Sequence, residues 1–286
     1  MRYLLIYSIK DPAGVNIKNN LDYLFNESSY TFKKNIDFFE SDKDLVELSQ
    51  EDLPKNYNYY IFLSKHKSGG KNPSAALTVH TSGNLTIDNS YGGNPEELCP
   101  CNGILNTIML KNINREYLKI INNNNNTSDN EVLDNGNNNN NNTSIKISFE
   151  GVHHGPSDLE IPSVFVEIGS TESEWKNDVL GRIIGRSILS TIEALERENY
   201  DKDVDRIICF GGGHYAPKFT KLALEGKYYV GYIVPKYAKV SHKVLNQMVE
   251  KQDFDCVIFD WKGLKSEDKK KYIRFFENNS ILWKRV

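Results

Sequence analysis

The sequence predicts an α/β fold: one domain over residues 1–286, with a mixed, mostly parallel sheet flanked by helices. Two observations predict it. Short apolar runs of strand length alternate with stretches of helical periodicity along most of the chain, as in repeated β-α units. The length of 286 residues is enough to bury a substantial core, and α/β domains reach this size as a single unit.

The expected strands share an apolar, aromatic or β-branched character, and most of them are followed by turn residues. They cover residues 2–8, 35–40, 58–66, 75–84, 144–149, 161–170, 205–210, 228–235 and 256–261. Four of these runs lead into a histidine or a glycine triplet. Open α/β sheets bind their ligands at the carboxyl ends of strands, so this placement predicts a functional site.

The expected helices follow from apolar periodicity and capping signals. They cover residues 12–25, 95–119, 171–195, 218–224 and 241–250, with a lysine-rich helix at the end of the chain. The helix from Thr171 has the clearest signal, because Thr171 and Glu174 have the spacing of a capping box. Residues 122–142 are dominated by asparagine, and such a polar tract buries too little surface to order itself. We expect a disordered insert there, within the domain.

Composition limits the class of protein. The net charge of −3 provides no general basic field, which argues against a DNA-coating protein. No stretch approaches the roughly 20 apolar residues of a membrane span, and the first residues are too short a run for a signal peptide. Four cysteines in a chain of this length do not indicate a disulfide framework. We therefore expect a cytoplasmic protein with no membrane partner.

Five of the six histidines lie near expected strand ends or turns, and only His242 falls in an expected surface helix. These five are His66, His80, His153, His154 and His214. Glu150 and Glu167 bracket the adjacent pair His153 and His154, and the following Gly155-Pro156 breaks strand regularity so that the two rings can serve one pocket. The alternative is a core histidine with a surface neighbour.

Imidazoles with one or two carboxylates suit Zn²⁺, which in catalytic sites takes three protein ligands and keeps one position open. Water on zinc ionises near neutral pH, so the pattern favours metal-assisted hydrolysis. The ligands come from distant segments, and the residues alone leave open which histidines hold metal and which one acts as a base. Three glycines, Gly211, Gly212 and Gly213, precede His214 and could present backbone amides to an oxyanion.

Lysines form local groups, among them Lys65 and Lys67, and Lys236, Lys239 and Lys243. Scattered surface lysines are the ordinary interpretation. If these groups converge on one rim of the site, they could hold an RNA phosphate backbone.

The motifs S-K-H, L-T-V-H-T-x-G-N, F-E-x-x-H-H-G-P, F-V-E-I-G-S and G-G-G-H-Y-A-P-K-F-T occur in this order, with D-W-K-G-L near the end. Together they resemble the D-aminoacyl-tRNA deacylases of the archaeal and plant type. The resemblance covers nearly the whole chain except residues 122–142. Val152 and Ser82 depart from the threonine and proline expected at those positions.

The resemblance implies a zinc-dependent hydrolase that cuts the ester between a D-amino acid and the terminal ribose of tRNA. It also implies a fold similar to those of phosphorylases and peptidyl-tRNA hydrolases. The implied metal ligands are His80, His153, His154, His214 and Glu167. The implied catalytic residues are His153, His154, Glu167 and His214, with His154 as one candidate base. We assign substrate binding to Lys65, His66, Asn84, Gly211, Gly212 and Gly213.

Two other interpretations stay open at this stage. Fold analogy alone allows a peptidyl-tRNA hydrolase or a nucleoside phosphorylase-like enzyme. A non-catalytic tRNA-binding or metal-carrying protein is the third class. We expect a monomer or a homodimer.

Overall fold

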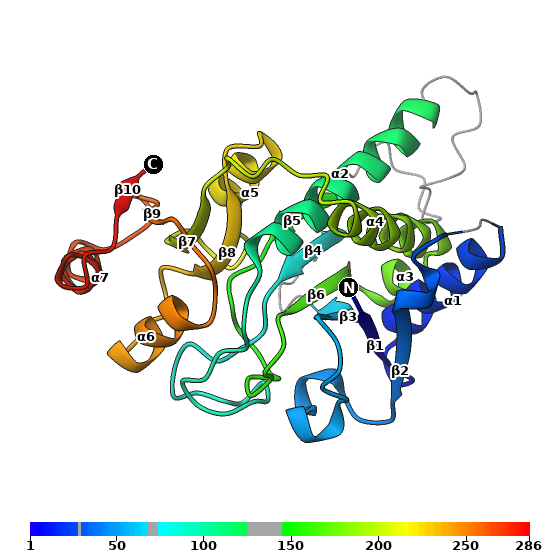
Figure 1. Ribbon diagram of the computed structural model, residues 1–286, viewed down its shortest axis with the longest axis horizontal. Helices are drawn as coiled ribbons and strands as arrows, with labels where there is room; N and C mark the ends of the chain where they lie inside the picture. Colours follow the sequence, from blue (N-terminus) through cyan, green and yellow to red (C-terminus); the bar gives the residue numbers. More distant parts are fainter. Residues whose placement is uncertain (28–29, 68–73, 125–144) are drawn as a thin grey trace.

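The computed structural model describes residues 1–27, 30–67, 74–124 and 145–286, and its strands form two sheets (Figure 1). The larger sheet has six strands in the order β2-β1-β3-β6-β4-β5. Its strands are β1 (Tyr3–Ser8), β2 (Ile36–Ser41), β3 (Tyr59–Lys67), β4 (Ala76–His80), β5 (Lys146–Phe149) and β6 (Ser163–Ser170). Neighbouring strands are parallel, except that β4 runs antiparallel to β6.

The smaller sheet has four parallel strands in the order β10-β9-β7-β8. They are β7 (Arg206–Phe210), β8 (Tyr229–Val234), β9 (Cys256–Phe259) and β10 (Trp283–Arg285). The predicted α/β class with a mixed, mostly parallel sheet is confirmed. The sequence did not predict that the strands divide into two sheets.

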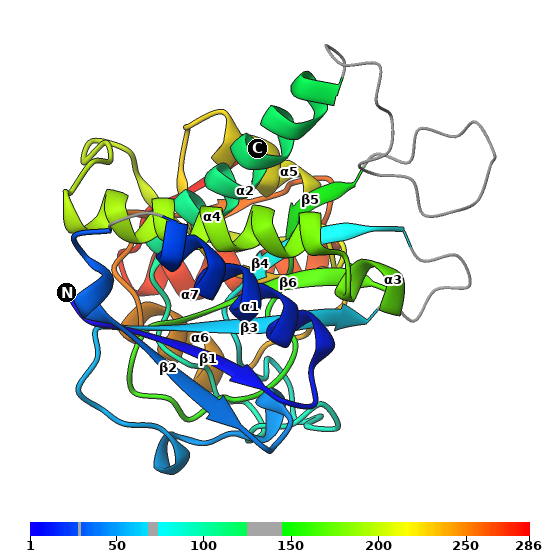
Figure 2. The ribbon, with the colours of Figure 1, turned by 90° about the vertical axis from the view of Figure 1, so that its right-hand side faces the viewer.

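Helices cover both sheets (Figures 1 and 2). The helices are α1 (Pro12–Glu27), α2 (Gly103–Asn124), α3 (Glu172–Trp175), α4 (Asp178–Glu196), α5 (Pro217–Leu224), α6 (His242–Glu250) and α7 (Ser266–Asn278). Single 3-10 turns occupy Lys33–Asn35, Leu45–Glu47 and Gln50–Asp52. Helices α1 and α4 pack together over the larger sheet, whereas apolar residues of α6 and α7 pack on the smaller one. Helix α2 contacts α4, β4 and β8, so one hydrophobic core includes residues of both sheets.

Strand β6 shows how the larger sheet separates its two faces. Its side chains alternate: Val164, Val166 and Ile168 join the core beneath the helices, while Phe165 and Glu167 point to the opposite face. That opposite face carries loops and the candidate site. All eight residues of β6 are buried, as expected for a central strand.

Two expected helices have different limits in the structure. The helix expected over residues 95–119 begins only at Gly103, because residues 95–102 are tied to α6: the amide of Leu98 donates to the Gln247 side chain and that of Cys101 to the Lys251 carbonyl. The helix expected over 171–195 is interrupted after Trp175. The Asn177 side chain accepts hydrogen bonds from the amides of Val179 and Leu180 and so caps α4 anew.

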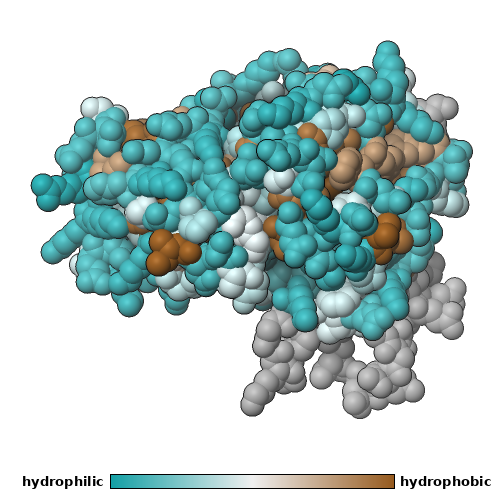
Figure 3. Space-filling model, turned by 90° about the horizontal axis from the view of Figure 1, so that it is seen from below, coloured by the Kyte–Doolittle hydropathy of each residue, from teal (hydrophilic) through white to brown (hydrophobic). Residues whose placement is uncertain are grey.

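The asparagine-rich insert is described only at its start. Residues 122–124 belong to α2, which corrects the expected disorder for these three positions. The remainder of the expected insert, residues 125–142, lies outside the described residues. The single-domain organisation stays a prediction. Among the described residues, no helix is both long and apolar enough to cross a membrane. Seen from below, the surface is largely hydrophilic with isolated hydrophobic residues (Figure 3).

Asp11 joins the start of α1 to the end of β3. One oxygen of this buried carboxylate accepts hydrogen bonds from the amides of Ala13 and Gly14, both at 3.0 Å, as an N-cap does. The other oxygen accepts one from the amide of Lys65 at 2.9 Å. The carboxylate therefore satisfies donors of two elements at once.

We predict that Asp11→Ala lowers the free energy of unfolding by about 2–3 kcal/mol, because a cap and a charged buried acceptor are lost together. Urea denaturation followed by circular dichroism measures the change. Asp22→Ala, which removes an exposed partner of Lys18 on the same helix, is the control and should change stability by less than about 0.5 kcal/mol. Equal losses in both variants would contradict the proposed role of Asp11.

Candidate active site and metal centre

Two buried carboxylates form the centre of the candidate site. Glu150 follows β5, and its side chain is fully buried. Three imidazoles surround it. Their nearest nitrogens lie 3.1 Å (His66 Nδ1), 3.7 Å (His153 Nε2) and 2.9 Å (His214 Nε2) from its oxygens.

Glu167, in β6, is surrounded in the same way. The nearest nitrogens lie 3.5 Å (His66 Nδ1), 3.6 Å (His80 Nε2) and 3.8 Å (His154 Nε2) from its oxygens. His66 contacts both carboxylates. We refer to His66, His80, Glu150, His153, His154, Glu167 and His214 as the histidine–carboxylate cluster. The prediction that the five histidines meet in one place is therefore supported by the geometry.

The sheet topology explains how His66 and His80 reach one carboxylate. His66 is paired with Gly169 and His80 with Phe165, so roughly 13 Å of strand separates their levels. Glu167 lies midway between these two levels. The sequence argument expected the two histidines to meet at one carboxyl edge of the sheet. They do not, because β4 is antiparallel to β6. They meet on one face of the sheet.

The other three histidines arrive on loops. His153 and His154 lie in the segment after β5, and His214 lies after β7. The amide of Gly151 donates to the His214 carbonyl at 2.9 Å and the amide of Gly83 donates to the His154 carbonyl at 2.7 Å. The first bond joins a loop of the larger sheet to a loop of the smaller one, and the second joins two loops of the larger sheet.

Backbone carbonyls orient three of the rings. Nδ1 lies 3.2 Å from the Thr81 oxygen in His80, 2.8 Å from the Gly151 oxygen in His153 and 2.6 Å from the Gly155 oxygen in His154. A carbonyl oxygen only accepts, so each neutral ring carries its proton on Nδ1 and has a lone pair on Nε2. Metal-binding histidines typically have this arrangement.

The cluster offers several sets of metal ligands. One ligand atom from each of His80, His153 and His154 lies within 4.8 Å of the others, and His66, Glu150 and His214 form a second such set. Both oxygens of Glu150 and Nε2 of His80 lack a well-directed hydrogen bond among the described residues, although His66 Nδ1 and His214 Nε2 lie 3.1 Å and 2.9 Å from Glu150. Buried polar atoms without partners are destabilising, and a cation between them would satisfy them. These residues therefore fit a metal ion.

Electrostatics favours a neutral ring at His153 and a charged carboxylate at Glu167. Burial, together with the neighbouring His154, His80 and His214, holds the pKa of His153 well below its usual value. Burial raises the pKa of Glu167, but contacts from the surrounding imidazoles outweigh it and hold that pKa well below the usual value. A neutral imidazole and an ionised carboxylate are the forms that bind metal.

The pKa of His66 shifts in the opposite direction to that of His153. Burial lowers the pKa of His66, but the nearby Glu167 and Glu150 outweigh burial and raise it above the usual value. Its Nε2 lies 3.0 Å from the Tyr215 hydroxyl. His66 was expected to bind substrate, whereas the structure places it inside the cluster, between the two carboxylates.

Lys65 does not reach the cluster. Adjacent residues in a strand point to opposite faces, so Lys65 points away from the face that carries His66. Its ammonium group lies 6.0 Å from the centre of the Trp175 ring, near α3. The expectation that Lys65 acts beside His66 in substrate binding is not supported by this geometry.

Asn84 is buried and follows Gly83, whose amide contacts the His154 carbonyl. Its side-chain amide donates to the carbonyls of Gly92, at 2.7 Å, and Asn94, at 3.1 Å. The amide thus holds the loop around residues 92–94. The predicted role of Asn84 in substrate binding remains untested, and its side chain already has a structural function.

The glycine triplet has a conformation that requires glycine at two positions. Gly211 and Gly212 have φ values of +115° and +83°, which side chains rarely adopt. The amide of Gly211 donates to the Val234 carbonyl at 2.8 Å, so this amide is occupied and does not face an oxyanion. Of the three amides expected to serve an oxyanion, those of Gly212 and Gly213 remain candidates.

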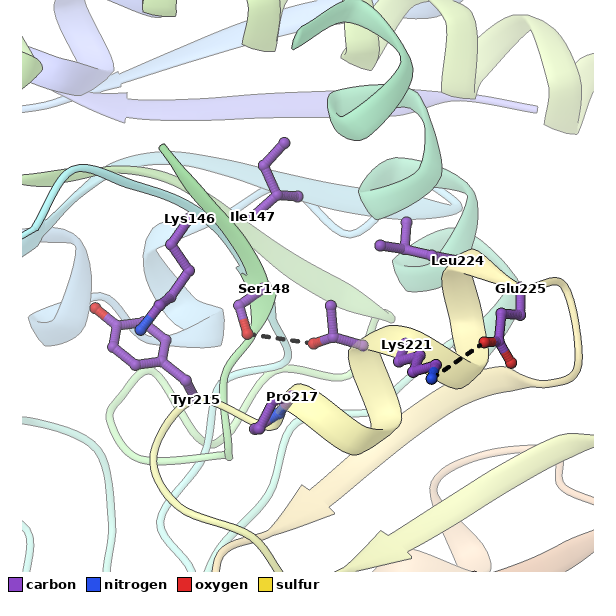
Figure 4. Close-up of a pocket in the computed structure, with 9 residues that line it drawn as sticks. Lys146, Ile147, Ser148, Tyr215, Pro217, Lys221, Leu224 and Glu225 are labelled. Atoms are coloured by element: carbon purple, nitrogen blue, oxygen red, sulfur yellow. Dashed lines mark hydrogen bonds and ion pairs between the residues drawn. The ribbon is translucent and has the colours of Figure 1, made fainter. Parts of the chain in front are cut away.

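A pocket of about 420 Å³ lies between β5 and α5 (Figure 4). Lys146 and Tyr215 stand at one end, with the lysine ammonium 4.3 Å from the centre of the tyrosine ring. Lys221, Leu224 and Glu225 lie at the other end (Figure 4). No residue of the histidine–carboxylate cluster lines this pocket. Tyr215 lies between this pocket and the histidine–carboxylate cluster, because it lines the pocket and its hydroxyl contacts His66.

The sequence argument gave too little weight to three residues. Glu150 was considered as a possible carboxylate beside the metal but was not named among the site residues, yet it contacts three imidazoles. Its place in F-E-x-x-H-H, directly after a strand, could have indicated this role. Tyr215 follows His214 directly and could have been included for that reason. Tyr237 lies 3.4 Å from His214 Nδ1, and its position carried no sequence signal.

We predict that a divalent transition-metal ion in about 100-fold excess over its Kd raises the Tm of the protein by about 5 °C or more, through preferential binding to the folded state. His153→Ala should reduce the shift strongly, because it removes a ligand. Differential scanning calorimetry with and without metal measures it. His242→Ala, on the surface helix α6, should retain the full shift. If zinc, nickel and manganese all leave the Tm of the protein unchanged, this result would argue against a metal centre.

Comparisons with known proteins identify the family of this chain. Residues 53–284 match the family model described as D-aminoacyl-tRNA deacylase. A D-aminoacyl-tRNA deacylase of Methanocaldococcus jannaschii is 52% identical over 286 residues, covering all of both chains. One from Methanococcus maripaludis is 46% identical, again over the whole of both chains, and one from Pyrococcus horikoshii is 32% identical over 90% of each.

A solved structure has the same fold. The crystal structure of a conserved protein of unknown function superimposes with a TM-score of 0.79 at 25% identity, covering 99% of this chain and 95% of that one. The sequence relationships extend over the whole length, through every segment that contributes to the histidine–carboxylate cluster. The chain belongs to the D-aminoacyl-tRNA deacylase family.

Proposed function

We propose that this protein hydrolyses the ester bond of D-aminoacyl-tRNA, releasing a free D-amino acid and tRNA, with water activated at a zinc centre. Membership of the deacylase family supports the substrate and the reaction. The observation that carries the mechanism is the convergence of five imidazoles on two buried carboxylates. We further propose that it works in the cytoplasm, as a monomer or homodimer.

His80, His153 and His154 are the residues that would hold zinc. Their Nδ1 atoms all contact backbone carbonyls, which leaves three Nε2 lone pairs available. Three protein ligands are the usual set in a catalytic zinc site. When bound, zinc supplies Lewis acidity toward the ester carbonyl and toward water. Glu167, beside His80 and His154, provides negative charge that balances a cation.

His214 is the general base that the geometry favours, in place of His154. The sequence left this role open, and His154 now belongs to the ligand set. The His214 side chain is one-third exposed, and its Nε2 lies 2.9 Å from Glu150. When the imidazole takes a proton from the attacking water, the carboxylate stabilises the positive charge. The same ring can then give that proton to the ribose oxygen as the ester C–O bond breaks.

His66 and Tyr215 act as supports in this scheme. The imidazole of His66 lies between the two carboxylates, and in its protonated form it reduces their repulsion. Tyr215 holds the Nε2 side of that ring. The amides of Gly212 and Gly213 adjoin His214 and are the donors we propose for the developing oxyanion.

The rival functions predict different products. A peptidyl-tRNA hydrolase would release N-blocked peptides, and a nucleoside phosphorylase would require phosphate. A non-catalytic tRNA-binding protein would show no turnover. Family membership favours the deacylase over all three.

We expect the protein to deacylate D-Tyr-tRNA much faster than L-Tyr-tRNA, and a chelator to abolish the activity until zinc is added back. Release of radiolabelled amino acid from each tRNA measures the rates. Equal cleavage of both enantiomers, or full activity of metal-free protein, would refute the proposal.

We predict separate effects for the base and for the ligands. His214→Gln should lower kcat by about 10²- to 10⁴-fold, the usual contribution of a general base, while the thermal shift on adding metal is retained. His153→Ala should lose both activity and the shift. Single-turnover kinetics and calorimetry on the same preparations give the two readouts. If His214→Gln also fails to respond to metal, His214 is a ligand rather than the base.

A further inference from the structure

An exposed aromatic ring lies at the rim of the histidine–carboxylate cluster. Tyr237 belongs to the loop between β8 and α6, and it is 58% exposed. Its hydroxyl lies 3.4 Å from Nδ1 of His214, whose other nitrogen faces Glu150. Large aromatic side chains usually bury most of their surface, so an exposed one next to reactive groups points to a ligand.

The loop that carries Tyr237 is fixed on both sides. The amide of Lys236 donates to the Gly212 carbonyl at 3.0 Å, which joins the loop to the glycine triplet. The Lys271 ammonium donates to the Val240 carbonyl at 2.6 Å, and the Val240 amide donates to the Tyr272 hydroxyl at 3.3 Å. The ring is therefore presented by a loop that both neighbouring segments hold in place.

Two lysines flank the ring in the sequence, and the ammonium group of Lys239 also lies 3.9 Å from Glu267. Lys236 precedes Tyr237 directly and Lys239 follows two residues later, and both are exposed. Since the chain has a net charge of −3, these lysines are a local feature rather than part of a general basic surface. An exposed aromatic ring with exposed lysines on the same loop is a combination that binds unpaired nucleotides, because the base stacks on the ring and the phosphates meet the positive charges.

We propose that Tyr237 is the stacking platform for the base of the 3′-terminal nucleotide of tRNA, with Lys236 and Lys239 holding the phosphates next to it. This inference rests on the proposed function. The scissile ester and the terminal base are attached to the same ribose. A substrate with its ester near His214 must therefore place that base within a few ångströms of the rim, where Tyr237 lies. The stacked base then fixes the ribose relative to the general base.

The test measures binding of uncharged tRNA, so it does not depend on hydrolysis. Fluorescence anisotropy compares intact tRNA with tRNA lacking its terminal nucleotide. The unaltered protein should prefer the intact tRNA by about tenfold, the order of one stacked base. Tyr237→Ala should bind both forms equally. Tyr237→Phe should keep the preference, because it retains the ring and loses only the hydroxyl that contacts His214.

Two controls distinguish the stacking site from general effects. Tyr23→Ala removes a half-exposed tyrosine from α1, on the larger sheet, and should keep the preference. Lys236→Gln and Lys239→Gln should weaken binding of both tRNA forms and lower the salt dependence, whereas Lys34→Gln should not.

The outcomes also separate this inference from the proposed function. Hydrolysis of D-Tyr-tRNA with an unchanged KM in Tyr237→Ala would overturn the stacking site and leave the deacylase intact. Loss of the preference in Tyr237→Ala without any hydrolysis by the unaltered protein would support the nucleotide site and refute the deacylase. Loss of the preference in Tyr237→Phe as well would show that the hydroxyl, not the ring, is responsible, and would overturn the proposal.

Discussion

Burial of two negative charges is the constraint on which the rest of the site depends. Glu150 and Glu167 are almost completely removed from solvent, and an isolated buried carboxylate costs several kcal/mol unless positive charge or hydrogen bonds compensate for it. Each carboxylate has three imidazoles within 4 Å, and His66 contacts both. Burial lowers the pKa of His66, but the two carboxylates raise it above its usual value, which favours the charged form and offsets part of the cost. Both Glu150 oxygens still lack a well-directed hydrogen bond, so part of the cost remains. A bound cation is the simplest way to remove that remainder.

The fold meets this constraint by combining two kinds of sheet surface. The larger sheet contributes a face: His66, His80 and Glu167 lie on three adjacent strands, and the reversed direction of β4 brings His80 toward β6 from the opposite edge. The smaller sheet contributes a carboxyl edge, from which β7 delivers His214 and β8 delivers Tyr237. Neither sheet alone supplies both the proposed metal ligands and the proposed general base. Helix α2, which contacts strands of both sheets, fixes the distance between the two surfaces.

The sequence predicted the members of the cluster better than their arrangement. Histidines at turns were recognisable by residue type, whereas the role of Glu150 depends on which rings surround it, and that is a tertiary property. Lys65 shows the same limit. Strand alternation separates it from His66, but the sequence alone did not show which of the two faced the site. The start of α2 was misplaced because residues 95–102 bond to α6, a contact between segments about 150 residues apart. Tyr237 looked like any surface tyrosine until the loop position was known.

The solvent exposure of the histidines indicates which of them suit metal binding and which one suits proton transfer. The His80 side chain is fully buried, His153 is 23% exposed and His214 is 33% exposed. A metal ligand functions best where water is excluded and the ring cannot rotate, and the carbonyl contacts of His80 and His153, two of the proposed ligands, provide that restraint. A general base must instead reach a proton on an incoming substrate, which requires an accessible nitrogen. Nδ1 of His214 lies 3.4 Å from the Tyr237 hydroxyl, so the proposed base and the proposed nucleotide platform both lie on the side of β7 and β8. The more buried side of the cluster, which carries the proposed metal ligands, can then remain rigid.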